Sequence, residues 1–161
     1  MKYTIALILM LCSSVALSND KMGWYLLAGG SIYQADEYSY VNDGVGLRLG
    51  LGVRTSNRIG FEILLDNPPF SEQWWGVHMS VVGTYTHETR PQTSLIFKVG
   101  MTNIYIESEY RSTRFNERTD PMFSVGILFD RSKRFQYEVS LNTVGREYLT
   151  NSIQGQIRYK F

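Results

Sequence analysis

Cysteine is nearly absent from this sequence: Cys12 is the only one in 161 residues. It lies within an N-terminal stretch that is predicted below to be removed, so the remaining domain would contain no disulfide. Lipid attachment at Cys12 would call for a small residue before it, and Leu11 is bulky. We therefore expect Cys12 to be an ordinary part of a leader.

Long apolar runs are missing from the rest of the chain. No segment beyond residue 18 has the roughly 18 or more consecutive apolar residues that a membrane-spanning helix needs. A chain of this kind can cross a membrane only as a closed β-barrel, the other structure that pairs every backbone group inside hydrocarbon. Proline is rare, with four residues, whereas the 11 tyrosines favour strands and the bilayer interface.

Histidine is scarce, and neither sign of charge dominates. Only His78 and His87 are present, and no metal-ligand spacing or glycine-rich phosphate loop accompanies them. Without Lys2, 15 of the 16 basic residues remain against 15 acidic residues, so residues 19–161 carry no net charge. We expect no metal, no cofactor and no nucleic-acid partner.

The first 18 residues have the pattern of a secretory signal peptide. Lys2 is an early cation, residues 5–11 form an apolar run, and small residues precede a polar stretch. The pattern predicts cleavage after Ser18. One domain, residues 19–161, would remain, and it is long enough to form a sizeable core.

The feature that the sequence has in abundance is alternation of period two. Its last nine residues, 153–161, place apolar or small side chains on one face of a strand and polar side chains on the other. A soluble strand could alternate in the same way, but here the apolar row ends on Phe161 and the polar row holds two Gln and two cations. Lipid outside and water inside fit this strand better.

Similar segments recur along the chain, and segment 44–55 is the clearest. Its aliphatic residues alternate with glycines and arginines. In a narrow barrel the aliphatic row would face lipid, and the glycines would leave room for inward side chains. The pattern predicts eight strands: residues 24–35, 44–55, 59–66, 74–86, 93–106, 121–130 and 134–143, and a last strand after residue 151.

These segments predict an all-β fold, an eight-stranded antiparallel up-and-down transmembrane β-barrel preceded by a cleaved signal peptide. Long connections follow the odd-numbered strands and short turns follow the even-numbered ones, as expected when both termini are periplasmic. A soluble lipocalin-like barrel would have an apolar interior, whereas the inward rows here are rich in charged and amide side chains. The long connections are residues 36–43, 67–73, 107–120 and 144–151.

The pattern also predicts contacts inside the barrel. A three-residue turn at 56–58 places Arg48 opposite Asp66 and Gly52 opposite Glu62, with Arg54 diagonal to Glu62. The interior of an eight-stranded barrel is just wide enough for side chains to fill. We expect a lumenal salt-bridge network made of Arg48, Arg54, Glu62, Asp66, Lys98, Glu138 and Arg158.

A series of short motifs gives the sequence a family likeness. The motifs are Trp24-Tyr25, Ile59-Gly60-Phe61-Glu62, Gly76-Val77, Gly83-Thr84-Tyr85 and the ending from Gly155 to Phe161. Over nearly all of residues 19–161, the chain resembles the small eight-stranded outer-membrane barrels exemplified by OmpX and the transmembrane domain of OmpA. We expect no counterpart of the peptidoglycan-binding domain that follows the OmpA barrel.

The resemblance implies roles for particular residues. It places Glu62 in a buried lumenal network; the family's second lumenal acid would fall near Leu128, so we expect closure through Glu138 instead. It also implies an outer-membrane location, contact with outer-membrane lipid and lipopolysaccharide, and recognition by the barrel-assembly machinery. The expected assembly signal is Ile157, Tyr159 and Phe161.

The nearly balanced lumenal charges favour a plugged barrel over an ion pathway. Function is then expected in the long connections, because loops commonly carry binding residues. The sequence predicts a monomeric structural or surface-interaction barrel, not an enzyme, that binds a host or surface ligand through its loops.

Two alternatives stay open. Some barrels of this size are lipid A acyltransferases or deacylases that use a His and a Ser. His78 and Ser80 share one face, with Glu62 or Asp66 available to orient the His. A narrow, low-conductance pore is the other alternative. We prefer a lumen-filling role for His78.

Overall fold

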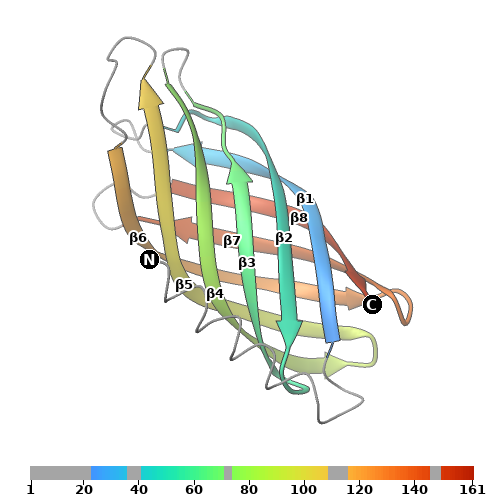
Figure 1. Cartoon of the computed structure of the whole chain (residues 1–161). Helices are drawn as coiled ribbons and strands as arrows, with labels where there is room; N and C mark the ends of the chain where they lie inside the picture. The colour runs from blue at the N-terminus through green and yellow to red at the C-terminus, as the bar shows by residue number, and fades with distance from the viewer. Residues whose placement is uncertain (1–22, 36–40, 71–73, 109–115, 146–149) are drawn as a thin grey trace.

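The computed structural model describes residues 23–35, 41–70, 74–108, 116–145 and 150–161. The predicted signal peptide, residues 1–18, and its cleavage point lie outside this part of the chain. The described residues form eight strands in one closed barrel (Figure 1). The strands are β1 (Gly23–Ala35), β2 (Gly44–Arg54), β3 (Ile59–Asn67), β4 (Trp74–Arg90), β5 (Thr93–Ser108), β6 (Asn116–Asp130), β7 (Phe135–Val144) and β8 (Thr150–Lys160).

The topology is up-and-down. Each strand pairs antiparallel with the next, and β8 pairs with β1 to close the ring. Closure gives each described strand a hydrogen-bonded neighbour on both sides, which a barrel in hydrocarbon requires. The predicted all-β, eight-stranded antiparallel fold is therefore confirmed. No helix in the described ranges is long and apolar enough to cross a membrane.

The register between β2 and β3 agrees with the sequence prediction. Arg48 lies opposite Asp66, and Gly52 lies opposite Glu62. The turn between the two strands is held by Ser56, whose Oγ accepts hydrogen bonds from the backbone N–H groups of Arg58 and Ile59 at 3.2 and 3.0 Å. This short turn fixes which residues of β2 and β3 face inward.

Several strands are longer than predicted, and β4, β5 and β6 exceed the prediction by the most. β4 continues to Arg90 and β5 extends from Thr93 to Ser108, so only Pro91 and Gln92 remain between them. Gln92 has a φ of 68°, which lets the chain reverse within this short turn. The apolar pattern underestimated the strands because their ends carry polar residues, which suit strand ends outside hydrocarbon.

The sixth strand also begins earlier than predicted. β6 starts at Asn116, and Pro121 lies inside it, opposite Met101 of β5. Proline lacks an N–H, so a strand start was expected there. However, β6 pairs with β7 only from Met122 onward, and on that side Pro121 contributes its carbonyl, which accepts a hydrogen bond from Gly145 N at 3.2 Å. From Asn116 to Pro121 the ladder pairing of β6 is with β5 alone.

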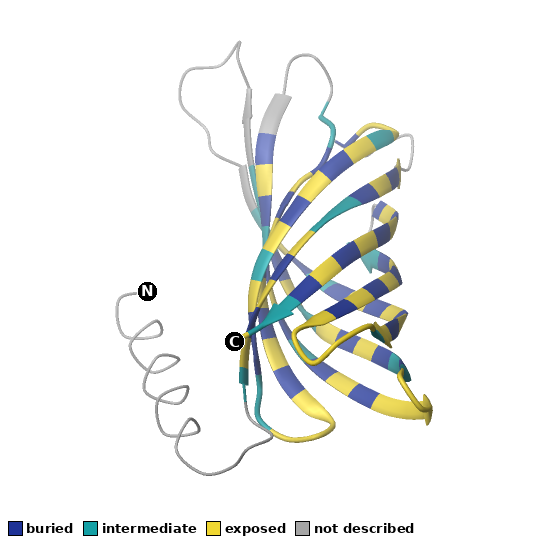
Figure 2. Cartoon of the chain, turned by 90° about the vertical axis from the view of Figure 1, so that its right-hand side faces the viewer, coloured by how far each residue is buried: buried dark blue, intermediate teal, exposed yellow. Residues whose placement is uncertain are grey.

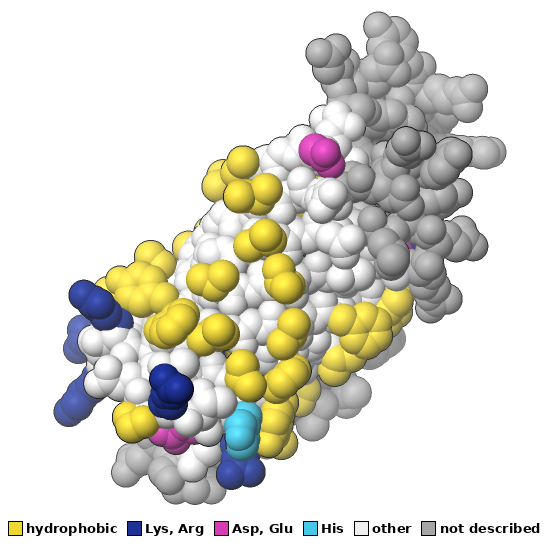
Figure 3. All heavy atoms as spheres, turned by 180° about the vertical axis from the view of Figure 1, so that it is seen from behind, with side chains coloured by type: hydrophobic (Ala, Val, Ile, Leu, Met, Phe, Trp, Pro, Cys, Tyr) yellow, Lys and Arg dark blue, Asp and Glu magenta, His cyan; other side chains and the backbone are white. Residues whose placement is uncertain are grey.

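The two faces of the strands differ sharply in composition. Exposed and buried residues alternate along each strand (Figure 2). In β2, for example, Leu49 is 61% exposed whereas Arg48 is 3% exposed. Apolar side chains are spread over the outer wall (Figure 3). An exposed apolar wall around a polar interior is the reverse of a soluble barrel and suits lipid.

The connections divide between the two ends of the barrel. The long ones follow β1, β3, β5 and β7, and the short ones follow β2, β4 and β6, as predicted. Within the described part of the long-connection end, Val41 and Phe70 form an isolated bridge, and Asn42 N donates to Pro69 O at 2.8 Å. Two long connections are thereby tied to each other.

Candidate functional site

The lumen is organised in layers, and successive inward residues of β3 show this directly. Glu62, Leu64 and Asp66 all face inward and are at most 3% exposed. Glu62 belongs to a charged layer, Leu64 to an apolar layer, and Asp66 to a second charged layer nearer the long connections. Each layer recruits side chains from several strands.

The first layer, which we call the charged ring, consists of Glu62, Lys98, Glu138 and Arg158. Lys98 Nζ lies 2.9 Å from Glu62 Oε2 and 2.7 Å from Glu138 Oε1. Arg158 Nη2 lies 2.8 Å from Glu62 Oε1 and also pairs with Glu138 Oε2. Two cations and two carboxylates alternate, so every charge in the ring has two opposite neighbours.

The charged ring crosses the lumen. Its residues come from β3, β5, β7 and β8, and β3 and β7 lie opposite each other in the closed order of strands. All four side chains are at most 2% exposed. Four buried side chains, two of each charge, therefore meet across the interior at this level.

Tyr25 of β1 completes the ring from one side. The Tyr25 hydroxyl donates a hydrogen bond of 2.9 Å to Glu62 Oε1. Arg158 Cζ lies 5.0 Å from the centre of the Tyr25 aromatic ring. Gly52 makes this position available, because a Cβ there would lie 2.3 Å from Tyr25 Cζ. The glycines predicted to make room in the lumen include this one.

The second charged layer is smaller. Arg48 forms a two-pronged pair with Asp66, with Nε–Oδ1 at 2.5 Å and Nη2–Oδ2 at 2.8 Å. Its Nη1 donates to Gln154 Oε1 on β8. Planar guanidinium and carboxylate groups match each other in this geometry. β2, β3 and β8 are thereby linked across the interior.

An apolar layer was missed by the sequence reasoning, which described the lumen as polar. Tyr25, Leu27, Leu64, Val82 and Met122 form a buried cluster. The sequence did contain evidence for this layer, because Leu64 and Met122 stand at the alternate positions of their strands that face the lumen. It was not noticed because the charged residues of the same rows dominated the interpretation.

Arg54 is the one residue of the predicted network that forms no ion pair with a described residue. No carboxylate oxygen of the described residues lies within 4.0 Å of its guanidinium. Glu62, its expected partner, is held by Lys98 and Arg158 instead. The diagonal placement was reasonable along the strands, but cations from across the lumen reach Glu62, and β2–β3 geometry alone could not show them.

Arg54 lines a cavity of about 930 Å³ at the short-turn end of the lumen, which we call the basal cavity. Tyr25, Leu128 and Gln136 are buried residues of its lining. Asp130 in its wall pairs with Lys160 Nζ at 3.1 Å and accepts a hydrogen bond from Gln136 Nε2 at 2.5 Å. The sequence reasoning did not predict this cavity.

The proposed catalytic pair is arranged differently from a nucleophile and its base. Ser80 Oγ is hydrogen-bonded to Thr102 Oγ1 at 2.8 Å. His78 Nε2 has no hydrogen-bond partner among the described residues, and its ring lies edge-on to Phe70 at 6.1 Å. The described residues also contain no group of three or more His, Cys, Asp or Glu arranged to hold a metal ion.

The predicted assembly signal lies on the outer wall at the short-turn end. Ile157 and Phe161 are exposed, and the Tyr159 ring packs against Phe161 at 5.5 Å and Phe135 at 5.2 Å. These residues form an aromatic group beside the short turns. Recognition by the assembly machinery stays a prediction.

Comparison with known proteins supports the fold. No protein-family model and no curated protein matches the sequence. Among solved structures, the N-terminal barrel domain of Pseudomonas aeruginosa OprF matches with a TM-score of 0.70 and 14% identity over 89% of this chain and 100% of that one. Neisserial surface protein A matches with a TM-score of 0.69 and 12% identity over 86% and 97%.

A third match is Ail, the attachment invasion locus protein of Yersinia pestis, in complex with the heparin analogue sucrose octasulfate. Its TM-score is 0.60, with 15% identity over 88% of this chain and 98% of that one. Identities this low establish architecture and leave function to be argued from the sites. With its closed eight-stranded ring and its apolar outer wall, the chain is a small β-barrel of the outer-membrane type.

Proposed function

We propose that this protein acts at the cell surface, using the barrel as an anchor and the long connections as the binding region. The observation that carries the proposal is the charged ring. Its four side chains meet across the lumen with three of their ion pairs at 2.7–2.9 Å, and all four are buried. A wall-to-wall plug supports anchoring rather than conduction.

The second charged layer and the apolar layer support the same proposal. The Arg48–Asp66 pair and the cluster around Leu64 fill two further levels of the lumen. A selective ion pathway would need a continuous wet channel with an excess of one charge along it. The ring instead contains two charges of each sign, matched to each other.

The ligand is proposed to bind at the long-connection end. The stretch 107–120 is rich in charged residues, and Arg118 Nε pairs with Asp120 Oδ2 at 2.8 Å where β6 emerges from the barrel. One structural neighbour, Ail, has been solved with a sulfated heparin analogue. A sulfated surface polysaccharide is therefore the first ligand to test, with lipopolysaccharide as the second.

We propose that His78 and Ser80 fill the lumen and do not catalyse a reaction. Ser80 Oγ is engaged by Thr102, and both groups are buried. A nucleophile would need a base within hydrogen-bond reach, and in the described part of the chain no hydrogen bond joins Ser80 to His78. Lipid A hydrolysis by the purified protein, abolished in Ser80→Ala, would reverse this assignment.

One pair of experiments tests the proposal. Planar-bilayer recording of the purified protein should give no stable conductance steps comparable to those of a general porin. Cells that carry a variant in which a short turn replaces residues 109–115 should lose adhesion to immobilised heparin, while surface expression stays equal. Replacing Asn57→Ser in a short turn provides the matched control. Porin-like steps, or undiminished adhesion of the loop variant, would contradict the proposal.

A further inference from the structure

The basal cavity has an unbalanced set of charges. Its lining combines five cationic side chains with two acidic ones: Arg54, Arg58, Arg90, Lys133 and Lys160 against Glu88 and Asp130. Asp130 is already paired with Lys160. The other four cationic side chains of the lining are accompanied by a single acidic one, Glu88. The contrast with the charged ring, where charges are matched, points to a group that is supplied from outside.

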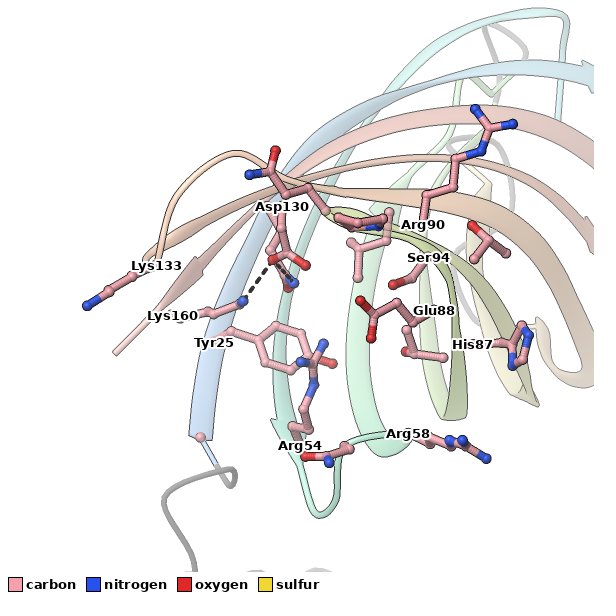
Figure 4. Close-up of a pocket in the computed structure, with 18 of the residues that line it drawn as sticks. Tyr25, Arg54, Arg58, His87, Glu88, Arg90, Ser94, Asp130, Lys133 and Lys160 are labelled. Atoms are coloured by element: carbon pink, nitrogen blue, oxygen red, sulfur yellow. Dashed lines mark hydrogen bonds and ion pairs between the residues drawn. The ribbon is translucent and has the colours of Figure 1, made fainter.

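Arg54 has the position of a binding residue. In Figure 4 its side chain extends from the end of β2 toward Tyr25, while Arg58, Arg90 and Lys133 lie around the rim and point away from the centre. Arg54 is half-buried, and no described carboxylate lies within 4.0 Å of its guanidinium. A guanidinium in a recess offers a fork of N–H donors that fits a carboxylate or phosphate group.

The cavity also has a suitable size and access. Its volume of about 930 Å³ falls in the range of small-molecule sites, which is roughly 300–1,000 Å³. It opens at the end that carries the short turns, and that end faces the periplasm in barrels of this type. Figure 3 shows Lys and Arg side chains gathered at this end on the displayed face. Such a field attracts small anions.

We propose that the basal cavity is a binding site for a small soluble organic anion, with Arg54 contacting its anionic group. A phosphate monoester fits best, because its double charge gains more from the cationic rim than a single carboxylate does. The site is separate from the proposed surface function, since it lies at the opposite end of the lumen. Its failure would leave that proposal untouched.

Glu88 makes the proposal specific. It is the one acidic side chain of the lining that has no ion pair with a described residue, and it faces the cavity (Figure 4). A bound anion is repelled by Glu88, so neutralising it tightens binding. A zwitterionic ligand would instead use Glu88 to hold an ammonium group. The Glu88→Gln variant therefore separates the two classes of ligand.

The test uses the purified protein in an uncharged detergent, with glucose 6-phosphate as the probe and glucose as its neutral counterpart. Titration calorimetry should detect binding of glucose 6-phosphate only. Arg54→Gln should weaken it about tenfold or more, the effect of losing roughly 1.4 kcal/mol of binding energy. Arg131→Gln removes an exposed cation of the same end that does not line the cavity, and it should leave the affinity unchanged.

Several outcomes would overturn the proposal. No binding of glucose 6-phosphate at a concentration about tenfold above a dissociation constant of about 1 mM would show that no anion site is built around Arg54. Equal weakening by Arg54→Gln and Arg131→Gln would show the same. Weaker binding of glucose 6-phosphate in Glu88→Gln would show that Glu88 does not repel the ligand, which contradicts an anion site. Binding seen only with phosphatidylglycerol vesicles would assign these cations to lipid headgroups. Unchanged heat-modifiable migration of each variant confirms that the barrel is folded.

Discussion

The charged ring and the basal cavity are neighbours in one lumen, but they differ in whether their charged side chains have ion-pair partners. In the ring, Lys98 and Arg158 each contact both Glu62 and Glu138. In the cavity, Arg54 has no carboxylate of a described residue within 4.0 Å. Matched buried charges hold a structure in one arrangement, whereas an unmatched cation in a recess is available to a ligand.

The difference follows from depth. Charges deep in the lumen lose most of their water, so they are tolerated only when oppositely charged groups replace it. Charges at the mouth keep part of their hydration and can remain unpaired. The comparison therefore makes a graded prediction: substitutions in the ring should affect stability, and substitutions in the cavity should affect binding.

The largest effect is expected for Glu62→Gln. It removes one of two carboxylates that neutralise Lys98 and Arg158, and breaking a buried pair in this way typically costs about 3–5 kcal/mol. Urea unfolding of the protein in liposomes measures the loss. Glu88→Gln, at an exposed position of the basal cavity, is the control and should be nearly neutral. Equal stability of the two variants would remove the distinction between ring and cavity.

The second effect concerns the wall around the ring. Leu49 is 61% exposed on the outer face of β2. Leu49→Arg should cost about 2–4 kcal/mol if this position lies near the middle of the bilayer. Val45→Arg, toward the long-connection end of the same strand, should cost less, about 0–1 kcal/mol. If liposome unfolding shows Val45→Arg to be the more costly change, the assumed depth of the barrel is wrong.

The third effect tests the space that Gly52 leaves for the Tyr25 side chain beside the charged ring. A Cβ at Gly52 would lie 2.3 Å from Tyr25 Cζ, so Gly52→Ala should displace the Tyr25 side chain, whose hydroxyl donates to Glu62. Overpacking of this kind costs about 1–3 kcal/mol. Gly155→Ala is the matched control, because nothing lies within 4 Å of a Cβ there. Indistinguishable denaturation midpoints for the two variants would argue against a packed Tyr25.

The fourth effect is a difference between two double-mutant cycles. Glu62 and Lys98 are in direct contact, so their coupling energy in unfolding should be about 0.5–3 kcal/mol. Glu62 and Arg54 form no ion pair, and their coupling should be clearly smaller. The reverse result would restore the Glu62–Arg54 pairing that the sequence suggested. It would also move Arg54 from the cavity into the ring.

The smallest effect on stability is expected for Arg54→Gln itself. Because Arg54 forms no ion pair with a described residue, its loss should change the free energy of unfolding by no more than about 0.5 kcal/mol. The same variant is expected to weaken anion binding. A large loss of stability without a loss of binding would show that Arg54 is a structural residue.

Much of the architecture could be predicted from local patterns. Period-two alternation identified all eight strands, and the short turn before Ile59 fixed the register that sets Arg48 opposite Asp66. These features depend on neighbouring residues and on one hairpin at a time. Strand ends were less well predicted: polarity does not end a strand that leaves the bilayer, so β5 extends to Ser108 and β6 begins at Asn116.

The sequence by itself determined which side chains face inward, because parity along a strand settles that question. Only the closed barrel decided which inward charges meet. Glu62 and Glu138 share Lys98 and Arg158 because closure brings β3, β5, β7 and β8 around one narrow lumen. Closure also left Arg54 beyond the ring, beside a cavity. Distances across a barrel depend on its curvature and stagger, which no single strand pair encodes.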